Sequence, residues 1–377
     1  MLEELIQLRQ ELHQYPEISG NESKTAQRIL DFLSKYKPDQ MITNLGGEGI
    51  LAIYKGKETG KSVLFRCELD ALPISEINSF DYKSVYEGVS HKCGHDGHMA
   101  ILCGLAKKLH EKPIEKGTVL LLFQPSEEDG NGAKRVLKDS KFEGIQPDFA
   151  FALHNLPGYK KHQIVIKEAT FTCAVNSMVI QLEGKTSHAG EPENGINPAL
   201  AIAEMLTLFN SKICTDVASK AYCLITPIHI NMGEKAYGVS AGYGEVHFTI
   251  RSNSNAHMRI IESNLEENVR KIASKFNLKT NIHWTQSFQA NENNLEAVNY
   301  IRKAASNLDL NVLEKELPFT FGEDFGLFTQ KFKGAMLGLG SGENTPALHN
   351  PDYDFPDEII TTGISLFYQI AKKTLDA

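Results

Sequence analysis

Short apolar runs alternate with helical patterns over the first half of the chain, and this alternation limits the possible folds more than any other feature. The apolar runs include GILAIYKG, SVLFRCELD, GTVLLLFQP and DFAFALHNLPG, whereas GHMAILCGLAKKLHEK repeats its apolar residues at helical spacing. Strands that alternate with helices are typical of open α/β sheets. The sequence therefore predicts an α/β fold with a mixed or parallel sheet flanked by helices.

The pattern changes near residue 171 and returns near residue 289. Between these points, strand-like stretches such as SMVIQLEGK and GEVHFTIRS are combined with two helical stretches. This order predicts a compact, ferredoxin-like α+β sheet with two helices on one face. We expect residues 1–170 to form the first part of a catalytic domain, residues 171–288 a smaller inserted domain, and residues 289–377 the second part of the catalytic domain.

Composition and charge argue against several classes of partner. The net charge is -8, and the chain has no run of lysine or arginine that could follow a phosphate backbone, so we expect no nucleic-acid partner. No apolar run approaches the ~18 residues of a membrane-spanning helix, and the N-terminus does not resemble a signal peptide. The six cysteines are scattered, unlike a disulfide framework. We expect a reduced, cytoplasmic protein without a membrane partner.

A capping motif is predicted near the N-terminus. Ser19 and Glu22 precede the helical stretch SKTAQRILDFLSKY at the spacing of a capping box. We therefore expect their side chains to cap that helix.

Residues that bind metals or carry protons occur where predicted strands end. In open α/β sheets, ligands bind at the carboxyl edge of the strands, so we expect these residues to line one site. They are Glu68 and Asp70 after SVLFRC, Glu127 and Glu128 after VLLLFQPS, His154 after FAFAL, and His349 after AMLGLGSG.

Cys93 and His95 belong to the stretch HKCGHDGHMA, which leads into a predicted helix. The N–H groups and the dipole at a helix N-terminus favour a thiolate, so we expect Cys93 to be a metal ligand rather than a packed thiol. By contrast, Cys103 lies at helical spacing within AILCGLA and is expected to pack in the core.

The donor types of these residues predict a metal site. A thiolate, neutral imidazoles and a carboxylate together suit zinc or another divalent transition ion. The candidate ligands are Cys93, His95, Glu128, His154 and His349. They exceed the ligand number of one open zinc site, which favours two ions, or one strong and one weak site. Glu127 stands beside the ligand Glu128 and is predicted to be the general base that takes the proton of water.

Eight stretches, in order along the chain, resemble a known family. They are LHQYPEIS, RCELDALPI, HKCGHDGHMA, QPSEE, ALHNLPG, GKTSHAGEPENGINPA, FGEDF and ALHNPDYDF. Together they resemble the metal-dependent amidohydrolases and peptidases that include aminoacylases, hippurate hydrolases and auxin-conjugate hydrolases. The resemblance implies hydrolysis of the amide bond of an N-acyl amino acid, such as an N-acetyl or N-benzoyl one, with one or two ions of zinc, manganese, nickel or cobalt per chain. It also implies that the insert is a lid or dimerisation domain.

The resemblance assigns roles to further residues. It implies the same five metal ligands, Glu127 as the base, and Asp70 as a residue that orients a ligand. His188, in the insert, resembles the lid histidine that reaches the scissile carbonyl, often across a homodimer interface. Arg251 would help to hold the carboxylate of the small-molecule substrate.

Two departures limit the resemblance. Peptidase members carry a metal-binding histidine two residues before the aspartate, where this chain has Glu68, which favours the cysteine-containing amidohydrolase branch. In addition, the stretch EKAYGVSAGYGEV lacks the asparagine and proline that many relatives have there.

Two alternatives stay open at this point. A dipeptidase or other exopeptidase on the same fold would need an anionic group near the metal to bind a free amino terminus. A catalytically silent protein that binds a metal or a small molecule is the second alternative, because a fold does not determine a function. The adjacent pair Glu127 and Glu128 favours an enzyme, since a binding protein needs no base beside a ligand.

Overall fold

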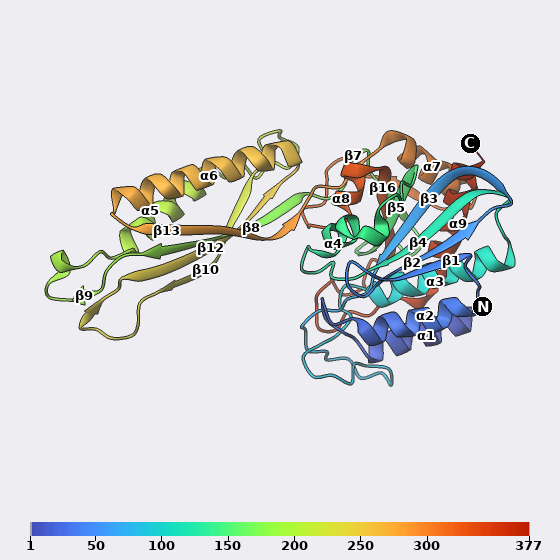
Figure 1. Cartoon of the computed structure of the whole chain (residues 1–377), viewed down its shortest axis with the longest axis horizontal. Coiled ribbons are helices and arrows are strands. Elements are labelled where there is room, and N and C mark those ends of the chain that lie inside the picture. Colours follow the sequence, from blue (N-terminus) through green and yellow to red (C-terminus); the bar gives the residue numbers. More distant parts are fainter. Residues whose placement is uncertain (1, 377) are drawn as a thin grey trace. The chain divides into compact units, whose positions relative to one another are not determined.

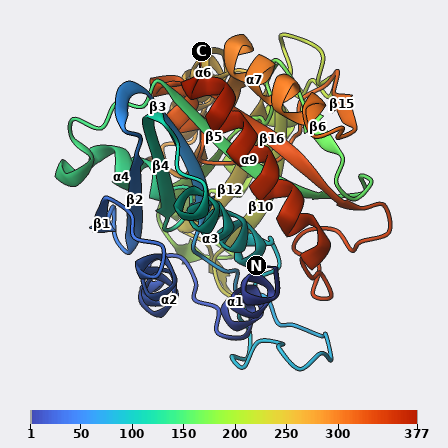
Figure 2. The same cartoon turned by 90° about the vertical axis from the view of Figure 1, so that its right-hand side faces the viewer.

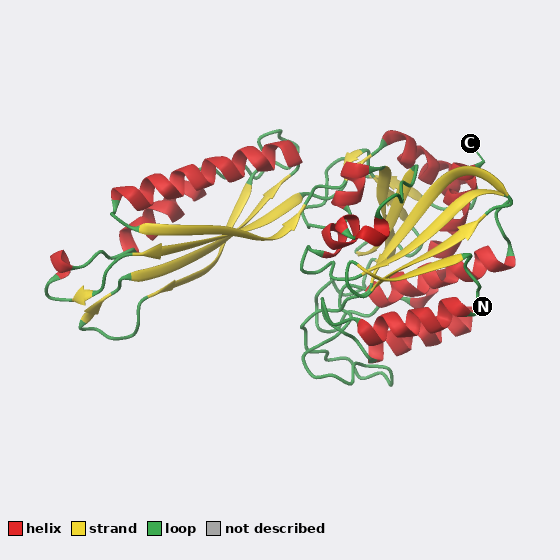
Figure 3. Ribbon diagram, viewed as in Figure 1, coloured by secondary structure: helices red, strands yellow, loops and turns green. Residues whose placement is uncertain are grey.

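The computed structural model describes residues 2–376, which form two compact units. Unit 1 comprises residues 2–171, 291–316 and 323–376, and unit 2 comprises Thr172–Ala290 and Leu317–Gly322. Figures 1 and 3 show the elements of both units. Among residues 2–376, no helix has the length and apolar character needed to cross a membrane.

Unit 1 is built on an eight-stranded mixed sheet with the order β1-β2-β4-β3-β5-β16-β6-β15. Parallel pairs β4/β3, β3/β5 and β5/β16 form its centre. Side chains of these strands are buried on both faces, as expected for strands covered by helices. The strands are β1 (Gln40–Leu45), β2 (Gly49–Lys55), β3 (Glu58–Glu68), β4 (Lys116–Gln124), β5 (Phe149–Pro157), β6 (Ile164–Ile166), β15 (Val312–Glu314) and β16 (Lys333–Gly342).

The helices of unit 1 pack against this sheet and against one another. Helices α3 and α9 contact each other and β3, and Figure 2 shows them side by side. Their buried side chains, such as Leu102 and Phe367, share one hydrophobic core with α1, α2 and α7. The helices are α1 (Leu2–Gln14), α2 (Ser23–Ser34), α3 (His95–Glu111), α4 (Gly132–Lys138), α7 (Leu295–Ser306), α8 (Gly326–Lys331) and α9 (Ile360–Leu375). The predicted α/β fold with a mixed sheet flanked by helices is confirmed.

Unit 2 has a four-stranded antiparallel sheet with the order β10-β12-β8-β13. In chain order, its main elements are β8 (Ala174–Glu183), α5 (Ala199–Asn210), β10 (Leu224–Met232), β12 (Tyr243–Ser252), α6 (Asn255–Lys275) and β13 (Lys279–Phe288). This strand–helix–strand–strand–helix–strand order gives the predicted ferredoxin-like arrangement. Burial alternates along β12, whose inward side chains share a second hydrophobic core with α5 and α6.

The predicted capping box at the start of α2 is wrong. Glu22 is the N-cap residue but makes no side-chain bond to the helix end. Its Oε1 accepts hydrogen bonds from the backbone N–H of Ser126 at 2.8 Å, and Ser19 Oγ donates to Asp70 Oδ2 at 2.7 Å. The Thr25 N–H donates instead to Glu17 Oε2 at 2.8 Å. Glu17 therefore serves the helix end, while Ser19 and Glu22 bond to residues that are distant in sequence.

Candidate metal centre and active site

The carboxyl ends of the central strands position the candidate site residues. Glu68 ends β3, Glu127 and Glu128 follow β4, and His349 follows β16. His154 differs from the expectation because it lies within β5 rather than after it. Since β3, β4, β5 and β16 run parallel, all of these residues lie toward the same edge of the sheet.

Two site segments contain a residue in the left-handed region of backbone space, which is uncommon for residues other than glycine. Ser126 has φ 55°, and its N–H and hydroxyl both donate to Glu22 Oε1. His349 has φ 67°, and its N–H donates to the Lys92 carbonyl at 2.8 Å. Such strain persists where surrounding contacts maintain it, and here those contacts fix the turns that present Glu127 and His349.

The turn before α3 requires a glycine. Gly94, the N-cap residue, has φ 94°, and a Cβ atom there would lie 2.6 Å from Asn155 Oδ1. With Gly94 in place, Cys93 precedes the helix and His95 is its first residue.

The five predicted ligands form one cluster. The ligand atoms of Cys93, His95 and His154 all lie within 4.8 Å of one another, as do those of Cys93, Glu128 and His349. Cys93 Sγ lies 3.4 Å from His154 Nε2. Glu128 Oε1 lies 3.8 Å from His95 Nε2 and 4.0 Å from His349 Nε2.

Backbone carbonyls orient two of the imidazoles. His95 Nδ1 lies 2.8 Å from the Asp70 carbonyl oxygen, and His154 Nδ1 lies 2.9 Å from the Asn155 carbonyl oxygen. A carbonyl oxygen only accepts hydrogen bonds, so each Nδ1 carries a proton. Burial lowers the pKa of His154 to about 3, so its ring is neutral and its Nε2 presents a lone pair to the cluster. Burial also opposes a charge on His95, but Asp70, Glu68 and Glu128 raise its pKa to about 10, so its Nε2 would release a proton when a cation binds. Asp70 thus orients His95 through its main chain, while its carboxylate accepts the Glu128 N–H at 3.0 Å.

The cluster fits a bound cation. His95 Nε2, Glu128 Oε1 and Asp70 Oδ1 are buried without a hydrogen-bond partner among the described residues. Orphaned buried polar atoms are costly unless something satisfies them. Their neighbours are a thiol and further imidazoles, at spacings that an ion with bond lengths of about 2.0–2.3 Å can bridge. The donor set therefore fits one or two divalent ions.

Buried carboxylates govern the protonation of this cluster. Burial, together with Asp70, raises the pKa of Glu128 to about 7. Burial, together with Glu128 and Glu127, raises the pKa of the Cys93 thiol well above its usual range. The expected helix-end preference for a Cys93 thiolate is therefore outweighed, because the nearby carboxylates oppose a further negative charge. A bound cation would reverse that balance.

Glu127 lies beside a buried ion cluster that the sequence analysis missed. Its Oε1 accepts the Asp324 N–H at 3.3 Å. Arg66 Nη2 lies 2.9 Å from Glu323 Oε1, and the Arg66 guanidinium also pairs with Asp324 and Glu68. Burial, and then the charges of Glu323, Glu128 and Asp324, raise the pKa of Glu127 well above its usual range. The available signal was Arg66, a charged residue inside the apolar stretch VLFRC.

Two further acidic residues near the ligands face basic side chains of the chain. Glu68 Oε2 lies 2.6 Å from His98 Nδ1, in addition to its contact with Arg66. Asp96 Oδ2 lies 2.8 Å from His13 Nδ1. Both carboxylates are fully buried.

The two candidate substrate-binding residues belong to unit 2. His188 is exposed on β9 (Ser187–His188), which pairs with β11 (Val239–Ser240). The Gly190 N–H donates to His188 Nδ1 at 3.1 Å, so the neutral ring carries its proton on Nε2 and presents a donor there. Arg251 lies near the end of β12, and its Nη1 donates to the Thr320 carbonyl at 2.6 Å.

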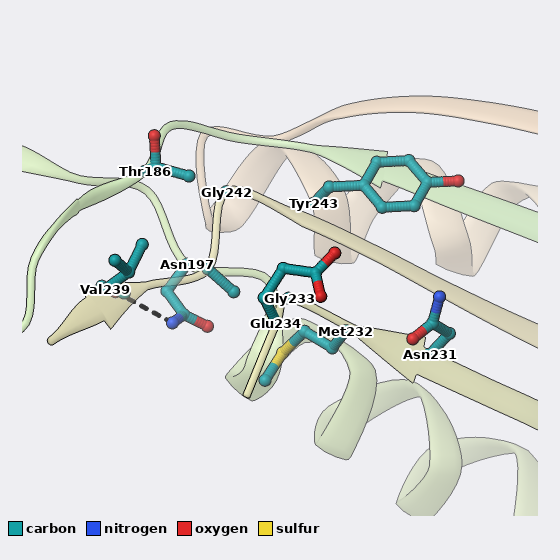
Figure 4. Close-up of a pocket in the computed structure, with 11 residues that line it drawn as sticks. Thr186, Asn197, Asn231, Met232, Gly233, Glu234, Val239, Gly242 and Tyr243 are labelled. Atoms are coloured by element: carbon teal, nitrogen blue, oxygen red, sulfur yellow. Dashed lines mark hydrogen bonds between the residues drawn. The ribbon is translucent and has the colours of Figure 1, made fainter. Parts of the chain in front are cut away.

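A cavity of about 400 Å³ lies next to β11 in unit 2. Figure 4 shows side chains of Thr186, Asn197, Tyr243 and Met232 around it. Asn197 Nδ2 donates to Ser240 Oγ at 3.0 Å across one wall. Part of its lining, from Glu234 to Tyr243, belongs to the stretch EKAYGVSAGYGEV.

Comparisons with known proteins identify a matching family. The family model described as peptidase family M20/M25/M40 matches residues 64–373. The chain is 30% identical to N-acetyl-L-cysteine deacetylase of Bacillus subtilis (strain 168), over 99% of this chain and 89% of that protein. It is also 30% identical to N-acetyldiaminopimelate deacetylase of Lactobacillus helveticus (strain DPC 4571), over 96% of this chain and 95% of that protein.

One solved structure matches this chain with a TM-score of 0.84 and 25% sequence identity. The match covers 100% of this chain and 98% of the chain in that structure. It is a Bacillus subtilis protein described as a dinuclear metal-binding peptidase of the M20 family. Since the family model spans most of the sequence, the chain belongs to peptidase family M20/M25/M40 and is a metal-dependent amidohydrolase of that family.

Proposed function

We propose that the protein hydrolyses the amide bond of N-acyl amino acids, with Glu127 as the general base. In this proposal, Cys93, His95, Glu128, His154 and His349 hold one or two divalent ions. The relatives that carry the names of N-acetylcysteine and N-acetyldiaminopimelate deacetylases support an N-acetyl amino acid as the substrate.

The observation that supports the proposal is that two adjacent glutamates have different surroundings. Glu128 Oε1 faces His95 and His349 and lacks a hydrogen-bond partner, as a metal ligand would in the metal-free protein. Glu127 Oε1 accepts a backbone N–H from Asp324. Its carboxylate lies close enough to His95 and Glu128 for all three ligand atoms to fall within 4.8 Å of one another. Glu127 therefore borders the ligand cluster while Asp324 holds its carboxylate in place.

A divalent ion in this set would supply positive charge that eases deprotonation of water and polarises the substrate carbonyl. Glu127 accepts the proton of the attacking water at its carboxylate and later donates it to the nitrogen of the departing amino group. Asp324 holds that carboxylate through its N–H, and Arg66 balances the surrounding negative charge.

The donor set also bears on the identity of the ion. Thiolate and imidazole ligands favour zinc and late transition ions over magnesium or calcium. Nickel, cobalt and manganese remain within the proposal, because a mixed nitrogen, oxygen and sulfur set accepts each of them.

We further propose that the protein is a homodimer formed through unit 2. The support is the edge strand β10, where Ile228 and Ile230 are 60% and 49% exposed. Exposed apolar edge strands are ready to pair with another strand. In such a dimer, His188 Nε2 would donate a hydrogen bond to the oxygen that gains charge as water attacks, and Arg251 would bind the substrate carboxylate. The cytoplasmic location stays a prediction from the sequence.

A substrate panel tests the proposed function. The metal-free protein is loaded separately with zinc, manganese, cobalt or nickel and assayed with N-acetyl amino acids, hippurate and dipeptides. We expect N-acyl amino acids to be hydrolysed with the highest kcat/KM. Faster cleavage of dipeptides would replace the proposal with an exopeptidase, and hydrolysis that is insensitive to chelators would contradict the metal site.

A further inference from the structure

We propose that Arg9 and His13, on helix α1, are positioning residues that fix the two chain segments carrying Cys93, His95 and His349. This inference rests on the ligand set proposed above. The two residues belong to a largely buried charge network that we call the α1 clamp. Its members are Arg9, His13, Glu76, Lys92, Asp96, Asp354 and Asp357.

Arg9 joins the two ligand-bearing segments through one guanidinium. Its side chain is fully buried, and its Nη1 donates to Asp354 Oδ1 at 2.7 Å and to Asp96 Oδ2 at 3.4 Å. Its Nε donates to Asp357 Oδ1 at 2.9 Å. Asp96 directly follows His95, whereas Asp354 and Asp357 lie on the chain that continues from His349. The guanidinium therefore bridges the start of α3 and the segment beyond β16.

His13 extends the clamp to the Cys93 side. Its Nδ1 lies 2.8 Å from Asp96 Oδ2, and its Nε2 lies 3.0 Å from Glu76 Oε1. Since each ring nitrogen faces a carboxylate, both donate, and the ring is held as a cation. Glu76 Oε1 also accepts from Lys92 Nζ at 2.6 Å, and Lys92 directly precedes Cys93.

Lys92 closes the clamp between the two segments. It is fully buried, and its Nζ donates to the Tyr353 carbonyl at 2.8 Å. Its own carbonyl accepts the His349 N–H at 2.8 Å. The main chain beside Cys93 is thus bonded directly to the main chain of His349.

The clamp holds the segments that carry the metal ligands and is not a second metal site. The ligand atoms of His13, Asp96 and Asp354 are close enough to hold an ion. However, the Arg9 guanidinium already donates to Asp354 Oδ1 and Asp96 Oδ2, and His13 Nδ1 also faces Asp96 Oδ2, so cations of the chain already pair with both carboxylates. Among the described residues, only the second oxygen of Asp96, Oδ1, has no hydrogen-bond partner in this group. Buried charges persist only when they are paired in this way, and pairing fixes the groups in one arrangement. Partners that orient metal ligands typically contribute 10- to 100-fold to metal affinity.

The test compares Arg9→Met with Arg28→Met in the full-length protein. Arg28 is a matched control because it also lies over a tyrosine ring, at 4.9 Å compared with 4.6 Å for Arg9, but pairs with the exposed Glu11. Affinity for zinc and for cobalt is measured by competition with a chelator, and the cobalt–thiolate absorption is recorded. We expect Arg9→Met to bind each metal about 10- to 100-fold more weakly, with an altered cobalt spectrum, and Arg9→Lys to lie between it and the parent. We expect Arg28→Met to stay within about twofold of the parent.

The inference is overturned if Arg9→Met binds zinc and cobalt as tightly as the parent and has the parental cobalt spectrum. A lower Tm alone would then show that Arg9 contributes only to stability. If Arg9→Met does not fold, metal affinity is measured instead for Asp357→Asn, which removes a charge that pairs with Arg9. Glu358→Gln is its control, because the Glu358 carboxylate pairs with Lys161 at the surface. Parental metal affinity in Asp357→Asn would then refute the clamp. Metal binding and hydrolysis by the parent protein test the proposed function separately, so the two failures are distinguishable.

Discussion

His95 Nε2 and Glu128 Oε1 face each other at 3.8 Å in the interior of unit 1, and neither atom has a hydrogen-bond partner among the described residues. Leaving a buried polar group unsatisfied costs about 1–3 kcal/mol. The pair is therefore a local source of instability that a bound divalent ion removes.

Metal binding should accordingly stabilise the protein. A metal present at about 100 times its dissociation constant adds about 2.7 kcal/mol to the free energy of unfolding, so the Tm should rise on loading and fall on chelation. Thermal unfolding with and without zinc or manganese measures this shift. His95→Ala serves as the control, since it should remove most of the metal-induced rise. An equal rise in the variant would mean that the ions bind elsewhere.

Arg66 should be among the most important charges for stability. Its fully buried guanidinium pairs with Glu68, Glu323 and Asp324. Removing one member of a buried ion network leaves its partners unpaired and typically costs 3–5 kcal/mol. We expect Arg66→Met to lower the free energy of unfolding in urea by about that amount. Arg135→Met, in an exposed pair with Asp129, should cost less than about 1 kcal/mol.

His13 should make stability depend on pH. The carboxylates of Asp96 and Glu76 overcome the effect of burial and raise the pKa of His13 to about 9. Since the unfolded value is about 6.5, the stabilisation is fully present below pH 6.5 and is lost as the pH rises through 9. A shift of that size corresponds to about 3 kcal/mol. Urea unfolding of the metal-free protein between pH 6 and 10 should show this decline, and His13→Gln should flatten it. An unchanged slope in His13→Gln would assign the decline to other groups.

His188 should affect turnover more than substrate binding. Losing one donor to the oxygen that gains charge typically lowers kcat by about 10²- to 10³-fold. We expect His188→Ala to lose kcat with little change in KM and with unchanged metal content. If the residue acts across a dimer, mixing His188→Ala chains with Glu127→Gln chains should restore part of the activity. If the kcat of His188→Ala stays within twofold of the parental value, His188 is an ordinary surface histidine without a role in turnover.

The sequence was informative where metal-binding or acidic side chains directly follow a predicted strand. The residues after β3, β4 and β16, together with His154, could be proposed as site residues because an apolar run ends in metal-binding side chains. The partners of these residues could not be identified in this way. Arg66 and Asp324 are separated by 258 positions, and neither periodicity nor motif spacing encodes such a contact. The capping prediction failed for the same reason, because Ser19 and Glu22 bond to loops that are distant in sequence.

The α1 clamp shows a similar limit. His13 had no local signal beyond a single histidine in an amphipathic helix, and its contacts with Asp96 and Glu76 arise only when α1 packs beside α3. A charged residue at a buried helical position is recognisable only after the packing of the helix is known.

The central claim is that Glu128 holds the metal while its neighbour Glu127 moves the proton. Glu127→Gln tests it most directly, because the amide keeps the shape of the side chain but cannot accept the proton of water. Metal content and kcat are measured on the same zinc-loaded samples of the parent, Glu127→Gln and Glu128→Gln. We predict that Glu127→Gln keeps the parental metal content and loses about 10²- to 10⁴-fold in kcat, whereas Glu128→Gln loses metal affinity. Near-parental kcat in Glu127→Gln, with loss of activity but full metal content in Glu128→Gln, would contradict the assignment and exchange the two roles.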